Sequence, residues 1–126
     1  RLMPHIAFHA HLPPLVFEDG ILVWDLIGPK QGAREMTTGV AVFGPGKGVK
    51  RHYHNCEETV TIIAGRAYCE VGGQRYLLQP YDTSFIEAGV PHRFLNASAS
   101  EPMVMVFSYS RADVTRTIVP DEDGTL

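Results

Sequence analysis

The chain has 126 residues, of which 44% are hydrophobic and 20% are charged, and its formal net charge is −3 at pH 7. Such a composition is typical of one globular domain that is large enough to bury a core without cross-links. The small negative charge gives no electrostatic reason to bind nucleic acid or an acidic membrane, and no apolar run reaches the length of a membrane-spanning helix.

The first twenty residues follow no clear period. The segment HIAFHAHLPPLVFEDG (5–20) predicts either an edge strand or an arm that exchanges with a second subunit. Its histidines, His5, His9 and His11, have no acid beside them, so arm residues are a better interpretation than a surface metal site.

Short runs rich in β-branched and aromatic residues follow, with turn signals such as GPGKG, QPYD and EAGVP between them. No long stretch shows the apolar period of an amphipathic helix. Short strands with close turns predict an all-β sandwich or barrel. The predicted strands lie at 21–27, 36–43, 49–54, 58–64, 66–71, 74–78, 83–87, 92–96 and 103–109.

The residues from Ser110 onward are polar, and their acidic end is expected to be loose. Two cysteines, Cys56 and Cys69, are too few for a disulfide framework. If the segments around Gly65 form a hairpin, Cys69 lies opposite Thr61. A bridge between the two cysteines is therefore not expected.

The segment RHYHNCEE (51–58) has two histidines one residue apart and two acids just after them. A polar strand facing water and part of a metal site both fit this pattern, and in a metal site only one of the acids would be the ligand. Strand alternation separates them, because Glu58 shares a face with Val60 and Ile62 whereas Glu57 shares a face with threonines. An inward carboxylate requires a cation, since burying it alone is costly.

His52 and His54 share one face of the preceding strand, and His92 begins a later strand on the inner face together with Phe94. Three imidazoles and one carboxylate suit a divalent first-row ion. The simpler alternative is a set of hydrogen-bonded core histidines, but two alternating histidines and an inward acid favour the metal.

Other side chains are weaker candidates for a substrate pocket. Lys50 shares a face with His52 and is a candidate anion clamp, although a solvated lysine at a strand start is the simpler interpretation. For most candidate walls core packing is the simpler interpretation, and a wall of this kind would favour a hydrophobic or aromatic substrate. The candidate walls are Trp24, Tyr68, Phe94, Met103, Met105 and Phe107.

These residues resemble the cupin family. Its first motif, G(X)5HXH(X)3–4E(X)6G, is matched at every fixed place by Gly46, His52, His54, Glu58 and Gly65.

The second cupin motif, G(X)5PXG(X)2H(X)3N, is matched by Gly89, His92 and Asn96. Tyr81 stands where the motif has its first glycine, and Glu87 stands where it has proline. Both departures concern local backbone shape and not metal binding.

The resemblance covers residues 36–109 and implies a single cupin domain, a jelly-roll barrel of the double-stranded β-helix type. Residues 1–20 would then be an N-terminal arm and residues 110–126 a polar tail. It also implies one Fe, Mn, Ni or Zn ion bound by His52, His54, Glu58 and His92.

Four protein ligands leave two positions of an octahedral ion for substrate or dioxygen, which predicts a metal-dependent enzyme acting on a small organic molecule. A dioxygenase is the first expectation and a redox-neutral isomerase or lyase the second. A non-catalytic protein that binds metal or a small ligand is the rival from another class.

A homodimer is also predicted, because the ILVWDLI strand (21–27) and the arm are more apolar than a lone small barrel needs. Neither nucleic acid nor membrane is expected as a partner. The numbered sequence shows no charged-then-apolar leader, so the expected location is the cytoplasm.

Overall fold

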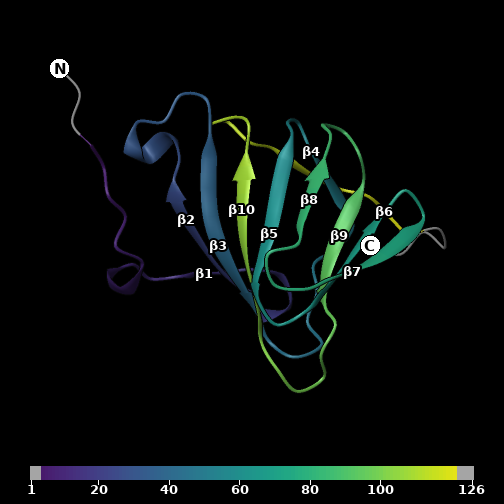
Figure 1. Ribbon diagram of the computed structural model, residues 1–126. Helices are drawn as coiled ribbons and strands as arrows, with labels where there is room; N and C mark the ends of the chain where they lie inside the picture. Colours follow the sequence, from purple (N-terminus) through teal and green to yellow (C-terminus); the bar gives the residue numbers. More distant parts are fainter. Residues whose placement is uncertain (1–3, 122–126) are drawn as a thin grey trace.

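The computed structural model describes residues 4–121 and consists of two antiparallel β-sheets (Figure 1). One sheet has the strand order β1 (Leu15–Val16), β2 (Leu22–Ile27), β3 (Thr37–Phe43), β10 (Met103–Tyr109), β5 (Glu58–Ala64), β8 (Thr83–Ile86). The other has the order β11 (Arg116–Ile118), β4 (His52–His54), β9 (His92–Asn96), β6 (Ala67–Val71), β7 (Gln74–Leu78). Three short 3-10 turns complete the described elements: η1 (His9–His11), η2 (Glu18–Gly20) and η3 (Pro29–Gln31).

The all-β prediction is confirmed, and the predicted strands correspond to β2 through β10 with nearly the same ends. The largest difference is at β4, which was expected from residue 49 and starts at His52. The loop before β4 is joined to β9 by an isolated bridge between Gly48 and Leu95. The regular pairing of β4 with β9 is at His52 and His92, so residues 49–51 are not part of the strand.

The sequence predicted no strand in the polar tail, but the structure has one there. Residues 116–118 form β11, which pairs with β4 and brings Arg116 opposite His54. The alternation of half-buried Val114, Arg116 and Ile118 with exposed threonines shows why this polar run forms a strand. The acidic end beyond residue 121 lies outside the described residues.

The hairpin considered around Gly65 is also wrong, because β5 and β6 belong to different sheets. Gly65 has a φ of 76°, and a Cβ at this position would clash with the carbonyl oxygen of Pro102. The chain therefore crosses between sheets at this glycine. Cys56 and Cys69 are free and buried, in agreement with the expectation of no bridge.

The core lies between the two sheets. Along β5 the buried positions Glu58, Val60 and Ile62 alternate with more exposed ones, and β10 follows the same rule. Phe43 and Phe94, from opposite sheets, are among the largest fully buried side chains. The inward face of β5 therefore contributes both to the hydrophobic core, through Val60 and Ile62, and to the candidate site, through Glu58.

Residues 15–20 of the N-terminal segment contact both sheets. β1 pairs with β2 as an edge strand, which is one of the two expected arrangements. In η2, Glu18 accepts a hydrogen bond from the Lys50 amide (2.9 Å) and Asp19 accepts one from the Gly48 amide (3.2 Å). These contacts fasten η2 to the loop that leads into β4. Within residues 4–121 there is no helix of the length and apolarity that a membrane crossing needs.

Candidate metal centre

Three strands bring the candidate ligands together. His52 and His54 are the inward positions of β4, and His92 is the residue of β9 that lies directly opposite His52. The ring centroids of His52 and His92 are 4.5 Å apart. Glu58 comes from the facing sheet, as the first residue of β5.

The predicted orientation of the two acids is confirmed. Glu58 is 4% exposed, whereas Glu57 is exposed to solvent. Strand alternation therefore selected the inward acid correctly.

The three imidazoles are oriented by backbone carbonyl groups. A carbonyl oxygen only accepts hydrogen bonds, so each Nδ1 atom carries a proton, and in the neutral ring the lone pair is then on Nε2. This is the tautomer that metal-binding histidines use. The Nδ1 contacts are His52 to Lys50 O (2.6 Å), His54 to Thr115 O (3.1 Å) and His92 to Val90 O (2.9 Å).

The Nε2 side of this cluster fits a bound cation. The potential ligand atoms of the three buried histidines lie within 4.8 Å of one another. The Nε2 atom of His54 is buried and has no hydrogen-bond partner in the described part of the chain. Glu58 Oε1 lies 3.0 Å from His92 Nε2 and 3.8 Å from His54 Nε2. The 3.0 Å contact has the length of a hydrogen bond in which His92 donates to the carboxylate, and a metal ion at the centre of the cluster could take the place of that proton.

Burial keeps His52 and His54 in the neutral form. Burial, assisted by the nearby Arg116 guanidinium, lowers the pKa of His52 to about 3. Burial also lowers the pKa of His54, against the opposing effect of the Glu58 carboxylate. Both rings are therefore neutral at neutral pH, which is the form that binds metal ions.

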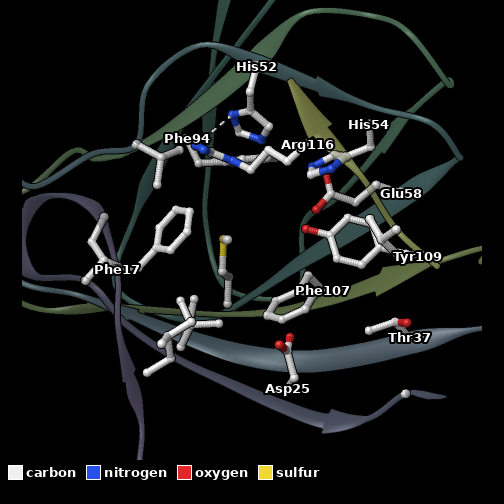
Figure 2. Close-up of a pocket in the computed structure, with 18 of the residues that line it drawn as sticks. Phe17, Asp25, Thr37, His52, His54, Glu58, Phe94, Phe107, Tyr109 and Arg116 are labelled. Carbon is white, nitrogen blue, oxygen red and sulfur yellow. Dashed lines mark hydrogen bonds and ion pairs between the residues drawn. The ribbon is translucent and has the colours of Figure 1, made fainter. Parts of the chain in front are cut away.

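A cavity of about 370 Å³ opens from His52, His54 and Glu58 (Figure 2). Its volume lies in the range of small-molecule sites. Most of the wall is apolar and much of it is aromatic, with contributions from Phe17, Val23, Phe43, Phe94, Met105 and Phe107.

Three of the predicted wall residues, Phe94, Met105 and Phe107, line this cavity. Met103 was expected there as well, but it is fully buried within the hydrophobic core. Trp24 is on the outer side of β2, where its Nε1 atom donates to the Leu12 carbonyl oxygen (3.0 Å).

Tyr68 and Lys50 are also placed away from the cavity. Tyr68 is the outward neighbour of buried Ala67 and Cys69, and the Arg75 guanidinium lies 4.4 Å from its ring centroid. Lys50 is exposed, as expected for a solvated lysine at a strand start. Neither residue lines the cavity, so the prediction of Tyr68 as a pocket wall is wrong and the simpler interpretation of Lys50 as a solvated lysine is confirmed.

The arm histidines form no metal cluster within residues 4–121. The ring of His9 instead packs against Trp24 with a centroid separation of 4.3 Å, and His11 lies near Phe8. The interpretation of these histidines as arm residues holds for the described chain.

Several cavity residues were missed in the sequence. Tyr109 shares the inward face of β10 with Met105 and Phe107, so alternation could have identified it. Burial and the adjacent Glu58 carboxylate raise the pKa of Tyr109 well above its ordinary value, and Figure 2 shows the two groups facing each other. The missed lining residues also include Phe17, Asp25 and Arg116.

Arg116 reaches the cavity from β11 and is held by Glu18 of η2. Its Nη1 and Nη2 atoms donate to the two carboxylate oxygens at 2.7 and 3.0 Å. The guanidinium also lies 4.8 Å from the ring centroid of Phe17. Two segments far apart in the chain therefore meet beside the candidate metal site.

Comparisons with known proteins agree with this architecture. The family model of the Cupin domain matches residues 39–109. Polyketide synthase CurC of Streptomyces cyaneus is 32% identical over 80 residues, which cover 63% of this chain and 51% of CurC. Auxin-binding protein 4 of Zea mays is 28% identical over 99 residues, covering 71% of this chain and 48% of that protein. The chain thus spans about half the length of these curated relatives.

A solved structure with a similar fold is the polyketide cyclase RemF from Streptomyces resistomycificus. The TM-score is 0.78 at 18% sequence identity, and the match covers 97% of this chain and 90% of RemF. At this identity the likeness shows a shared fold.

Proposed function

Because the chain belongs to the cupin family, we propose that it is a metal-dependent enzyme that cyclises a polyketide-like substrate in a redox-neutral reaction. The observation that carries this proposal is the largely apolar cavity, with several aromatic side chains in its wall, that opens directly from the buried histidines. Such a wall suits a flat, apolar substrate that contacts the metal centre at one end.

The comparisons support the choice of substrate class. CurC is a polyketide synthase and RemF is a polyketide cyclase, and they were found by sequence and by fold respectively. A polyketone chain offers several carbonyl oxygens to a metal centre. Ring closure within it needs neither an oxidant nor a reductant.

We propose His52, His54, His92 and Glu58 as the ligands of one divalent transition-metal ion, with Fe, Mn, Ni and Zn all compatible with these donors. When bound, such an ion supplies Lewis acidity that polarises a carbonyl oxygen. The protein contributes orientation and proton transfer around it.

Phe17, Phe94 and Phe107 would hold the polyketone flat and exclude water from it. In the proposed reaction a carbon next to a carbonyl group, at one end of the polyketone unit, loses a proton to a carboxylate, for which Asp25 is the candidate across the cavity (Figure 2). That carbon forms a bond with another carbonyl carbon, whose oxygen then takes up a proton from the Tyr109 hydroxyl. Loss of water completes an aromatic ring, and solvent restores both protonation states.

The test is to incubate metal-reconstituted protein with a linear synthetic triketone and to follow the product by mass spectrometry and the dissolved oxygen by an electrode. The expected product has the mass of the substrate or is lighter by one water, and no dioxygen is consumed. Tyr109→Phe should slow turnover by about a hundredfold, in the range typical of a lost proton donor. Tyr53→Phe, on the outward side of β4, is the matched control.

An unchanged rate over the uncatalysed background with each of the four metals would contradict the cyclase. A dioxygenase is the second candidate, because three histidines and one glutamate leave two coordination positions open on an octahedral iron. Dioxygen uptake by the Fe(II)-loaded protein, with a product that gains oxygen, would favour it. Ligand binding without turnover would favour a non-catalytic binding protein.

Three wider expectations belong to the same proposal. We expect the enzyme to act as a homodimer in the cytoplasm, with a small organic molecule as its ligand.

A further inference from the structure

We propose that Arg116 selects a substrate that carries a carboxylate and holds this group beside the metal centre. The inference rests on the proposed function, because it concerns the same cavity. It goes further by assigning the charge of the substrate and the residue that recognises it.

Strand pairing positions the guanidinium of Arg116 at the cavity. Pairing of β11 with β4 sets Arg116 opposite His54, and the side chain lines the cavity while only 22% exposed. Its Nη2 atom lies 3.4 Å from His52 Nδ1. The imidazole ring of His52 therefore lies between the guanidinium and the Nε2 atom that would bind the metal.

Arg116 is held in place by residues of the N-terminal segment and not by His52. The Nδ1 atom of His52 already donates to the Lys50 carbonyl, so two N–H donors face each other and His52 does not attract the guanidinium. Glu18 and the ring of Phe17 hold it instead. Arg116 is thus fixed from its outer side, and its orientation does not depend on a ligand.

Arg116 has more N–H donors than its contacts with Glu18 use. The acceptors bonded to Arg116 in the described chain are the two oxygens of Glu18. A guanidinium has more N–H groups than these two bonds use, and they lie in one plane that matches a carboxylate. The remaining donors are available to a ligand.

The cavity lining contains both acidic and basic side chains. Its lining includes the acids Asp25 and Glu58 and the bases Lys30 and Arg116. Lys30 is exposed, so Arg116 is the inner cation among the described lining residues. Apolar walls around it strengthen a charge-assisted hydrogen bond to a bound anion.

The experiment compares two probes of the same shape, naphthoate and the uncharged naphthamide, by isothermal titration calorimetry. Wild-type protein, tested both metal-free and loaded with Zn²⁺, should bind naphthoate at least about tenfold more tightly than naphthamide. Arg116→Gln should weaken naphthoate binding by about tenfold and leave naphthamide binding unchanged. The metal's own attraction for the anion is common to both proteins and cancels from this comparison.

Arg111→Gln is the matched control, because Arg111 is an exposed arginine paired with Asp113 outside the cavity lining. It should keep the preference for naphthoate. Arg116→Lys should keep the positive charge and part of the preference, and it replaces Arg116→Gln in the test if the glutamine variant does not fold.

Equal affinity of the wild type for both probes would overturn the proposal. Equal losses for both probes in Arg116→Gln would also overturn it, because they would indicate a structural role. These outcomes are separate from turnover of a triketone. The cyclase can fail while the carboxylate preference is present, and the reverse is equally observable.

Discussion

Glu57 and Glu58 are identical side chains at adjacent positions, and their surroundings differ completely. Glu58 faces His92 and His54 in the interior, whereas Glu57 is exposed and its amide donates to the Ser110 hydroxyl (3.0 Å). The pair therefore offers a test in which the chemical change is constant and only the location varies.

Glu58→Gln should weaken Zn²⁺ binding by at least about tenfold, because it removes an anionic ligand from a buried site. Glu57→Gln should bind Zn²⁺ like the wild type. Competition with a chromophoric chelator measures both constants. Wild-type affinity in Glu58→Gln would show that the three histidines bind the ion without the carboxylate.

Metal-free protein should lose stability as the pH falls below about 6.5. In that range an unfolded histidine takes up a proton, while folded His52, with a pKa of about 3, does not. The unfolded state then binds more protons, so the free energy of unfolding should decrease by about 2 kcal/mol per such histidine near pH 5.

Urea denaturation at about pH 7 and pH 5 measures this difference. His52→Gln should show a smaller loss than the wild type, and the exposed His11→Gln should show the same loss as the wild type. Equal stability of the wild type at both pH values would contradict the burial of neutral histidines.

At the scale of elements, alternation along strands was sufficient to predict the inward face of β4, β5 and β9. It identified His52, Glu58 and His92 because each sits in a run with a clear buried face. Alternation gave no such choice along the strand that holds Met105 and Phe107, which is apolar on both faces, although both of these candidate walls do line the cavity.

Other cavity residues could not be predicted in the same way. Arg116 lies in a short polar strand whose buried side exists only because β4 and η2 pack against it. Its partner Glu18 is 98 positions away in the chain. No local pattern reports such a contact, so the strand at 116–118 was not predicted from the sequence.

The turn between β7 and β8 carries a measurable strain. Tyr81, which replaces the glycine of the second cupin motif, has a φ of 75° and is 81% exposed. Its amide nevertheless donates to the Ile62 carbonyl (2.7 Å), which holds the turn against β5. A side chain in the left-handed region costs about 1–2 kcal/mol, and here it makes little packing contact in return.

Tyr81→Gly should therefore raise the free energy of unfolding by about 0.5–1 kcal/mol, after allowance for the greater freedom of glycine in the unfolded chain. Denaturant titration measures this change. Tyr76→Gly, at an exposed position within β7, should lower the stability. A Tyr81→Gly variant less stable than the wild type would show that the tyrosine ring contributes to the turn.

At the scale of the whole molecule, apolar side chains gather along the N-terminal segment. Ile6, Phe8, Leu15 and Val16 are each at least 59% exposed, and the last two belong to the edge strand β1. An exposed apolar edge strand is a ready surface for pairing with another chain. These residues are the natural place for the predicted dimer contact.

Light scattering should give twice the mass of one chain. Val16→Lys should shift the mass toward one chain, because it places a charge in the proposed contact. Phe85→Lys, which changes an exposed aromatic residue of β8 at the other edge of the same sheet, should leave the dimer intact. A single-chain mass across the accessible concentration range would contradict the dimer.

The hydrogen bonds that orient the three imidazoles end on main-chain oxygens of residues 50, 90 and 115. Every amino acid has such an oxygen, so replacing the side chains at these positions leaves the orienting bonds in place. The orientation of the three imidazoles is therefore insensitive to side-chain substitutions at these positions in the surrounding loops. Selection can reshape those loops for new substrates over evolutionary time while the same metal-binding geometry is inherited unchanged.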